Sequence, residues 1–241
     1  MGRAGRMVRA VLRHLNDTRG VSLYEITAAV AMTGILAAVA VPVIIEKTTE
    51  AKAARVSQEV DAISQAISAF KRDTGKVPGE AEAGILVLLS GPQGMHALLP
   101  NNAGAAFNVP GVSIDDSSHT CSSGCANMND YLVRDPNLVF PSTNGSVGYP
   151  GWKGPYIDEL LIDQFDRSYL VNVAPMYKQE GPPPPGTCGF GWVISGGPDR
   201  TLGTSFRRTN LEPDTDDIGK NNGKRLGPGS GCTASTTESV N

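Results

Sequence analysis

The feature that most constrains this chain is an uncharged apolar run of 20 residues, Ile26–Ile45. A helix of that length spans roughly 30 Å, the thickness of the hydrocarbon core of a bilayer. Before the run, residues 1–20 hold five arginines and one aspartate, a net charge of +4, which leaves −7 for the rest of a chain whose total is −3. The positive-inside rule predicts that this basic end stays in the cytoplasm.

Three kinds of targeting segment share this pattern. A secretory signal peptide has a basic start, an apolar run and a small-residue cleavage site, here Ala38-Val39-Ala40. A signal anchor is not cut, and a prepilin leader is cut before the apolar run. Glu25 separates them, because a carboxylate at mid-bilayer costs roughly 2.5–3.5 kcal/mol and neither a signal peptide nor an anchor uses one. The alternative interpretation is that Glu25 lies at the headgroup level and is solvated.

The stretch 19–45 resembles the N-terminal signal of type IV pilins and type II secretion pseudopilins. Those proteins have a basic leader that ends in Gly, here Gly20, and Glu as the fifth residue after the cut, here Glu25. Many also have Pro in the second half of the run, here Pro42. The family usually has Phe directly after the cut, whereas this chain has Val21. The resemblance implies cleavage after Gly20 by a prepilin peptidase and N-methylation of Val21.

The physical role of Glu25 follows from that cleavage, which would create a charged amine at Val21. In a bundle of staggered helices, Glu25 of one subunit can pair with the amine of another, and pairing offsets the cost of burying either charge alone. Such a pair favours assembly at one register, as buried polar groups do in coiled coils. Pro42 removes one helix hydrogen bond, so we expect a kink or local melting there.

Beyond Ile45 the chain turns polar but keeps a helical period. Apolar residues recur three or four positions apart and form a stripe on one helix face: Ala53, Val56, Val60, Ile63, Ile67 and Phe70. Gly75 and Pro78 are stop signals. We therefore expect one helix over about residues 22–72, with its stripe packed on a small sheet.

The globular body carries a second resemblance. Phe70–Pro78, Gly151–Ile157 and Asp163–Tyr169 are similar to parts of major pseudopilins of type II secretion, although the Pro-Trp-Gly turn of the family is poorly kept here. Residues rich in β-branched and aromatic side chains predict strands at Tyr169–Val173 and Gly191–Ser195. Gly84–Leu89 is a candidate short helix.

These patterns predict an α+β fold, in which a long N-terminal helix packs on a small antiparallel sheet beside a loop-rich C-terminal region. The expected organisation is a leader at 1–20, a membrane or filament-core helix at 21–45, its amphipathic half at 46–75, a periplasmic body at 76–218 and a polar tail at 219–241.

Four cysteines all follow the apolar run, namely Cys121, Cys125, Cys188 and Cys232. An even number on one side of a membrane fits disulfides in an oxidising compartment. Three pairings are open; the short spacing favours Cys121 with Cys125, which leaves Cys188 for Cys232. Zinc bound by His119 and the first two thiols is the alternative, but that set lacks a fourth ligand.

Acidic residues lie on two C-terminal segments. Asp199 follows the Gly-rich turn Ser195–Pro198, and Asp214, Asp216 and Asp217 precede Ile218. Carboxylates with backbone carbonyls are the oxygen ligands that Ca²⁺ prefers. Major pseudopilins bind calcium in a loop of similar sequence, and the resemblance implies Asp199, Asp216 and Asp217 as ligands, with Asp214 less directly. The alternative is a solvated acidic turn paired with Arg207 and Arg208.

The sequence has no Gly-x-Ser-x-Gly, His-Glu-x-x-His, P-loop or dinucleotide fingerprint, so we do not expect an enzyme. The acidic remainder argues against nucleic acid as a partner. The resemblance implies a subunit of a type II secretion pseudopilus, single-pass in the inner membrane with a periplasmic body. Its partners would be copies of itself, related pilin-like subunits, an inner-membrane assembly platform and the prepilin peptidase. The alternatives are a major or minor pilin of a type IV pilus and a membrane-anchored periplasmic binding or adhesive module.

Cleavage after Gly20 is directly testable. We expect N-terminal sequencing of the mature protein to begin at Val21, with its amine methylated. A mature protein that begins at Val41 would instead identify an ordinary signal peptide, and the filament interpretation would fail.

Overall fold

The structure is a computed structural model that describes residues 22–82, 84–91, 99–106, 112–115, 117–139, 148–158, 162–177, 191–204 and 216–221. Gly20, Val21, Cys188, Asp214 and Cys232 lie outside these residues. The chain divides into two compact units between Thr48 and Thr49. Its elements are α2 (Leu23–Thr74), β1 (Val87–Leu89), α3 (Ala103–Ala106), β2 (Ser113–Asp115), β3 (Thr120–Ser123), β4 (Cys125–Asn127), α4 (Asn129–Leu132), α5 (Pro136–Val139), β5 (Leu170–Asn172), η1 (Ala174–Met176), β6 (Trp192–Ser195) and β7 (Ile218–Asn221).

The long N-terminal helix is confirmed, because α2 runs from Leu23 to Thr74. It continues through Pro42 without a break, so the local melting that Pro42 suggests does not occur. At its C-terminus, the N–H of Gly75 donates to the carbonyl oxygen of Lys71 at 2.9 Å. Gly75 has φ +72°, the left-handed conformation in which helices commonly end and which glycine adopts without strain.

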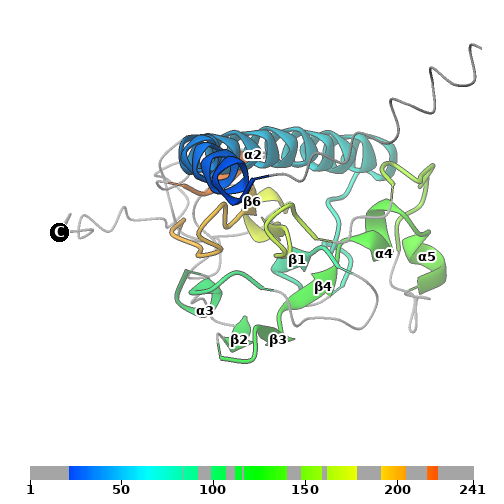
Figure 1. Cartoon of the computed structure of the whole chain (residues 1–241). Coiled ribbons are helices and arrows are strands. Elements are labelled where there is room, and N and C mark those ends of the chain that lie inside the picture. Colours follow the sequence, from blue (N-terminus) through cyan, green and yellow to red (C-terminus); the bar gives the residue numbers. More distant parts are fainter. Residues whose placement is uncertain are drawn as a thin grey trace, which may run out of the picture. The chain divides into compact units, whose positions relative to one another are not determined.

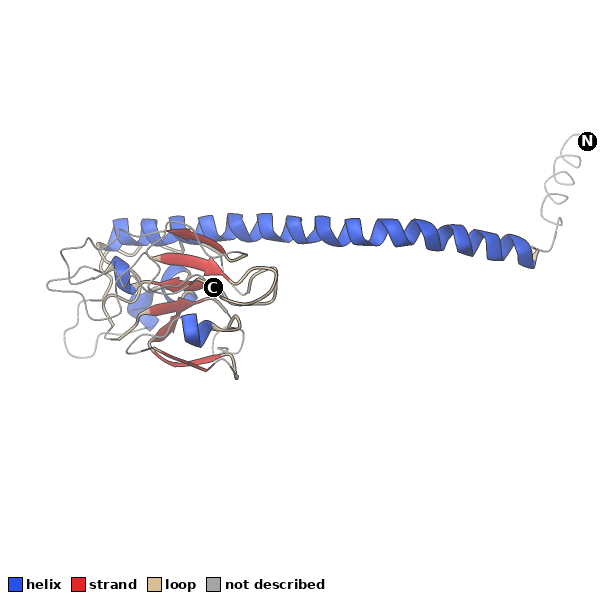
Figure 2. Cartoon of the chain, turned by 90° about the vertical axis from the view of Figure 1, so that its left-hand side faces the viewer, coloured by secondary structure: helices blue, strands red, loops and turns tan. Residues whose placement is uncertain are grey.

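The predicted apolar stripe forms the core of the second unit. Val56, Val60, Ile63, Ile67 and Phe70 are each at most 2% exposed. They pack in one cluster with sheet residues that include Leu88 of β1, Val171 of β5 and Val193 of β6. Figure 2 shows the strands gathered beside the C-terminal part of α2. Fully burying an aliphatic or phenyl side chain contributes about 1.5–3 kcal/mol, so this stripe is a major source of the unit's stability.

The main sheet has five strands in the order β4-β1-β5-β6-β7, and it is mixed rather than antiparallel as predicted. The pairs β1–β5, β5–β6 and β6–β7 are antiparallel, whereas β1 and β4 are parallel. A parallel pair needs a long crossover, and α3 with the β2–β3 hairpin supplies it (Figure 1). The expected helix over Gly84–Leu89 is wrong, because Val87–Leu89 form the fully buried strand β1. Strand β7 extends three residues past residue 218, the predicted end of the body.

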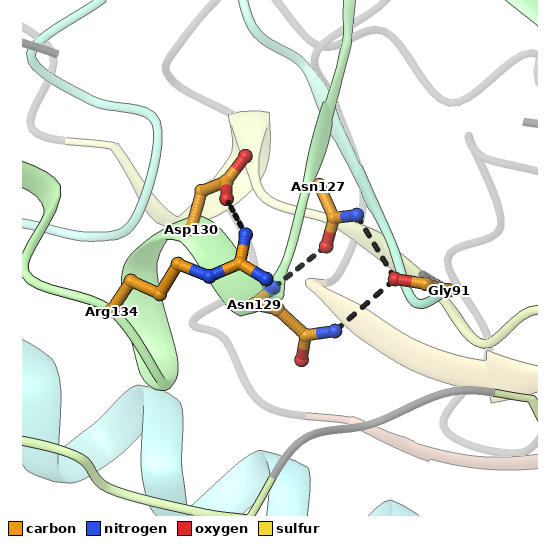
Figure 3. Close-up of polar contacts among 5 residues, drawn as sticks. All are labelled: Gly91, Asn127, Asn129, Asp130 and Arg134. Carbon is orange, nitrogen blue, oxygen red and sulfur yellow. Dashed lines mark hydrogen bonds and ion pairs between the residues drawn. The ribbon is translucent and has the colours of Figure 1, made fainter. Parts of the chain in front are cut away.

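A cluster of amide side chains fixes the corner between β4 and α4. Both Asn127 and Asn129 donate through Nδ2 to the carbonyl oxygen of Gly91, at 3.0 and 3.2 Å (Figure 3). The Oδ1 of Asn127 accepts the backbone N–H of Asn129 at 2.9 Å. Arg134 pairs with Asp130 one helical turn away, at 2.8 Å. These groups satisfy one another, so we assign the cluster a structural role.

Candidate functional site

The first unit presents an apolar helix that no described side chain covers. From Leu23 to Ile45, the large apolar residues are about half to four-fifths exposed: Leu23, Tyr24, Ile26, Val30, Met32, Ile35, Leu36, Val39, Val41, Val43, Ile44 and Ile45. Contiguous apolar surface on this scale marks contact with lipid or with another protein. By length and composition, α2 is able to cross a membrane, consistent with a single-pass membrane protein.

Glu25 also has a partner within its own chain, the backbone of Ser22. Its Oε2 accepts the backbone N–H of Ser22 at 3.0 Å, and the Oγ of Ser22 accepts the N–H of Tyr24 at 3.4 Å. Ser followed by Glu three residues later is the capping-box pattern, visible in the sequence as Ser22–Glu25. A negative charge in the first turn also complements the helix dipole. A carboxylate has two oxygens and accepts several hydrogen bonds, so capping leaves room for a second partner.

The second candidate site lies where β6 and β7 meet. These strands pair antiparallel with Ser195 opposite Ile218, so the segment after β6 and the segment before β7 leave the same end of the sheet. The first segment carries Asp199 and the second carries Asp216 and Asp217. The pairing therefore places the segments that carry three of the four predicted calcium ligands at one end of the sheet.

Asp217 is the buried member of this acidic group, only 6% exposed. Its Oδ2 accepts the backbone N–H groups of Gly203 and Thr204, at 3.0 and 2.6 Å. Its Oδ1 is also buried and has no hydrogen-bond partner among the described residues. Burial raises the pKa of Asp217 despite these hydrogen bonds. A buried carboxylate oxygen without a partner is costly, and a cation would satisfy it.

Burial raises the pKa of Asp199, and the nearby Asp216 carboxyl group raises it further. Repulsion between neighbouring carboxylates disfavours the state in which both are ionised, and a cation between them would relieve it. The Oδ1 of Asp199 also accepts the N–H of Thr201 at 2.7 Å. The described residues nevertheless contain no group of three or more His, Cys, Asp or Glu side chains arranged to hold a metal ion. A full shell would therefore need backbone carbonyls, water or residues outside the described set.

The structure pairs Cys121 with Cys125 in a disulfide, as the short spacing predicts. Their Cα atoms are 6.3 Å apart, within the usual range for such bonds. The bond joins β3 to the start of β4. Both thiols are consumed, so the alternative zinc site with His119 is excluded for these residues. The predicted pairing of Cys188 with Cys232 lies outside the described residues.

Comparison with known proteins adds no family assignment. The chain matched no protein-family model, no curated protein and no solved structure. The features that bear on function are therefore the apolar helix, Glu25 and the acidic loops.

Peptide mapping without reduction tests the cysteine chemistry. We expect to recover Cys121 linked to Cys125, because β3 and β4 hold these two residues at bonding distance. If Cys188 and Cys232 also pair, alkylation before reduction should label no cysteine. Alkylation after reduction should then label all four. Recovery of Cys121 linked to Cys188 would contradict the structure, and labelling of all four before reduction would contradict an oxidising compartment.

Proposed function

We propose that this chain is a structural subunit of a pilus-like filament, the pseudopilus of a type II secretion system, and that it is not an enzyme. The observation that carries the proposal is the division within α2. One face of its C-terminal half packs in a folded body, and its N-terminal half is apolar, exposed and headed by Glu25. A subunit needs both parts, because the body must be complete before the helix leaves the bilayer for a filament.

The location follows from the charge pattern. The basic residues before Gly20 stay cytoplasmic by the positive-inside rule, which places the body in the periplasm. The Cys121–Cys125 disulfide supports an oxidising compartment for the body. The prepilin peptidase would cut on the cytoplasmic side, and an inner-membrane assembly platform with related subunits would receive the processed chain.

Two other functions share these features in part. A major or minor pilin of a type IV pilus would use the same helix and the same Glu25, and differs in the system that assembles it. A membrane-anchored binding or adhesive module would use α2 only as an anchor. In that case Glu25 would serve only as the helix cap, and its charge would not matter for assembly.

Two substitutions at Glu25 separate the cap from the charge. Glu25→Gln keeps a side chain suited to a capping box but removes the charge, whereas Glu25→Leu removes both. We expect both variants to insert in the membrane at normal levels and to lose filaments. The reason is that removing one partner of a buried pair costs about 3–5 kcal/mol. The measurement compares membrane content with filaments sheared or crosslinked from cells that lack wild-type protein.

The Gln variant decides between the interpretations. Filament loss in both variants supports pairing of Glu25 with another subunit's amine. Loss in Glu25→Leu alone would mean that Glu25 acts as a helix cap. Filament yield unchanged in both would leave the anchored module as the better account.

We also propose that the body binds calcium through Asp199, Asp216 and Asp217, with Asp214 as a further ligand. The unpartnered Oδ1 of Asp217 and the adjacent carboxyl groups of Asp199 and Asp216 support this site. A divalent cation would offset the cost of burying the Asp217 oxygen and the repulsion between the Asp199 and Asp216 carboxylates. Backbone carbonyls of the two segments would complete the shell of oxygens that Ca²⁺ prefers.

Calcium should raise the melting temperature of the full-length protein in detergent relative to the same protein in chelator. A ligand at a hundredfold excess over Kd stabilises the folded state by about 2.7 kcal/mol. Asp217→Asn should abolish the difference, because its amide oxygen can still accept the Gly203 and Thr204 N–H groups while the charge is lost. Asp166→Asn, at an exposed residue of a neighbouring turn, is the control and should respond as wild type does. An unchanged melting temperature in wild type would leave a plain acidic turn.

A further inference from the structure

Asp163 is a buried carboxylate that belongs neither to α2 nor to the proposed cation ligands. It is 3% exposed and lies in the turn before β5. Its Oδ1 accepts the backbone N–H groups of Phe165 and Arg167, both at 2.8 Å. These two bonds hold the turn 163–167 in shape. They do not explain the second oxygen, Oδ2, which faces another part of the chain.

Oδ2 of Asp163 accepts the hydroxyl of Ser195 at 2.5 Å. Ser195 is the last residue of β6, fully buried, and the segment that carries Asp199 starts directly after it. Because an ionised carboxylate only accepts hydrogen bonds, Asp163 fixes the direction of the Ser195 proton. The Oγ of Ser195 is then turned to accept the backbone N–H of Gly197, at 3.2 Å.

Gly197 is one point at which the two acidic segments touch. Its φ is +60°, and a Cβ at this position would overlap the backbone carbonyl oxygen of Asp216. A hydrogen bond that holds Gly197 in place therefore helps to hold the segment of Asp199 against the segment of Asp216 and Asp217. The chain of contacts runs from Asp163 through Ser195 to this junction.

We propose that Asp163, acting through Ser195, is a positioning residue for the cation site. The proposal rests on the calcium site proposed above and adds a residue to it that is not a ligand. Hydrogen-bonded groups outside the ligand shell orient the ligands of metal sites, and their removal typically costs 10–100-fold in affinity. Here the group positioned is a stretch of backbone, because Ser195 and Gly197 lead into Asp199.

The same turn offers a matched control. Asp166, three residues on, also reaches the first acidic segment, with its Oδ2 3.0 Å from a guanidinium nitrogen of Arg200. The side chains of Asp166 and Arg200 are 72% and 48% exposed. Exposed ion pairs of this kind contribute little to stability. Asp166 has φ +65°, a conformation that Asn tolerates well. Asp166→Asn therefore removes a charge and an ion pair near the site without straining the backbone.

Calcium titration calorimetry on the full-length protein in detergent tests the proposal. Asp163→Asn keeps an oxygen for the Phe165 and Arg167 N–H groups but places an amide, a donor, against the Ser195 hydroxyl. Ser195→Ala removes the link from the other side and serves if Asp163→Asn does not fold. We expect each variant to bind calcium about 10–100-fold more weakly and Asp166→Asn to stay within about twofold of wild type. We expect the double variant to lose little more affinity than either single variant, because both substitutions break the same Asp163–Ser195 hydrogen bond.

The outcomes separate this proposal from the site on which it rests. If both variants bind as wild type does while Asp217→Asn does not bind, the cation site stands and the positioning role is wrong. A lower melting temperature in chelator with unchanged calcium affinity also overturns it, since Asp163 would then serve only the fold. Losses that add in the double variant would show that the two residues act separately. Absence of calcium binding in wild type overturns both proposals.

Discussion

The packing of one face of α2 against the sheet is the interaction on which the rest of the body depends. Phe70, Ile63 and their neighbours fill the core together with Leu88, Val171 and Val193. Among the described residues, no side chain before Ala53 contributes to either hydrophobic cluster. The core is thus complete without the apolar half of α2. The apolar half has no such surroundings among the described residues, which is consistent with a membrane-spanning helix.

Three acidic side chains that matter for the proposed sites accept hydrogen bonds from backbone N–H groups. Glu25 accepts from Ser22, Asp163 from Phe165 and Arg167, and Asp217 from Gly203 and Thr204. Such bonds offset part of the cost of placing a carboxylate in a poorly solvated position. Asp217 differs in having a second buried oxygen without a partner among the described residues. The proposed ligand Asp217 and the proposed positioning residue Asp163 differ in this respect.

The sequence predicts those features that depend on local pattern. The period of Val56, Ile63 and Phe70 specifies the buried face of α2, and Gly75 specifies where it ends, because both depend on neighbours within a few residues. The Ser22–Glu25 capping pattern is equally local and is readable from the same letters. The two strands rich in β-branched and aromatic residues are likewise found close to their predicted positions.

Features that depend on distant partners are not readable in the same way. Val87–Leu89 is too short to show a period, and its strand character comes from pairing with β4 and β5. The direction of β4 depends on how the crossover returns, which single residues do not encode. The hydrogen bond between Thr204 and Asp217 joins residues 13 positions apart. The bond between Asp163 and Ser195 joins residues 32 positions apart. Pairing of β6 with β7 brings Asp217 to Gly203 and Thr204, and pairing of β5 with β6 brings the turn of Asp163 to Ser195. No short sequence motif predicts either contact.

The position of β7 at the edge of the main sheet has a consequence for solubility. Strand β6 is entirely buried and rich in large apolar residues, and β7 occupies one of its two hydrogen-bonding edges. An exposed, flat apolar edge strand is a template for pairing with other chains and hence for aggregation. Strand β7 therefore covers this edge of β6 and prevents such pairing. Loss of β7 from the sheet would expose this edge of β6 to pairing with other chains.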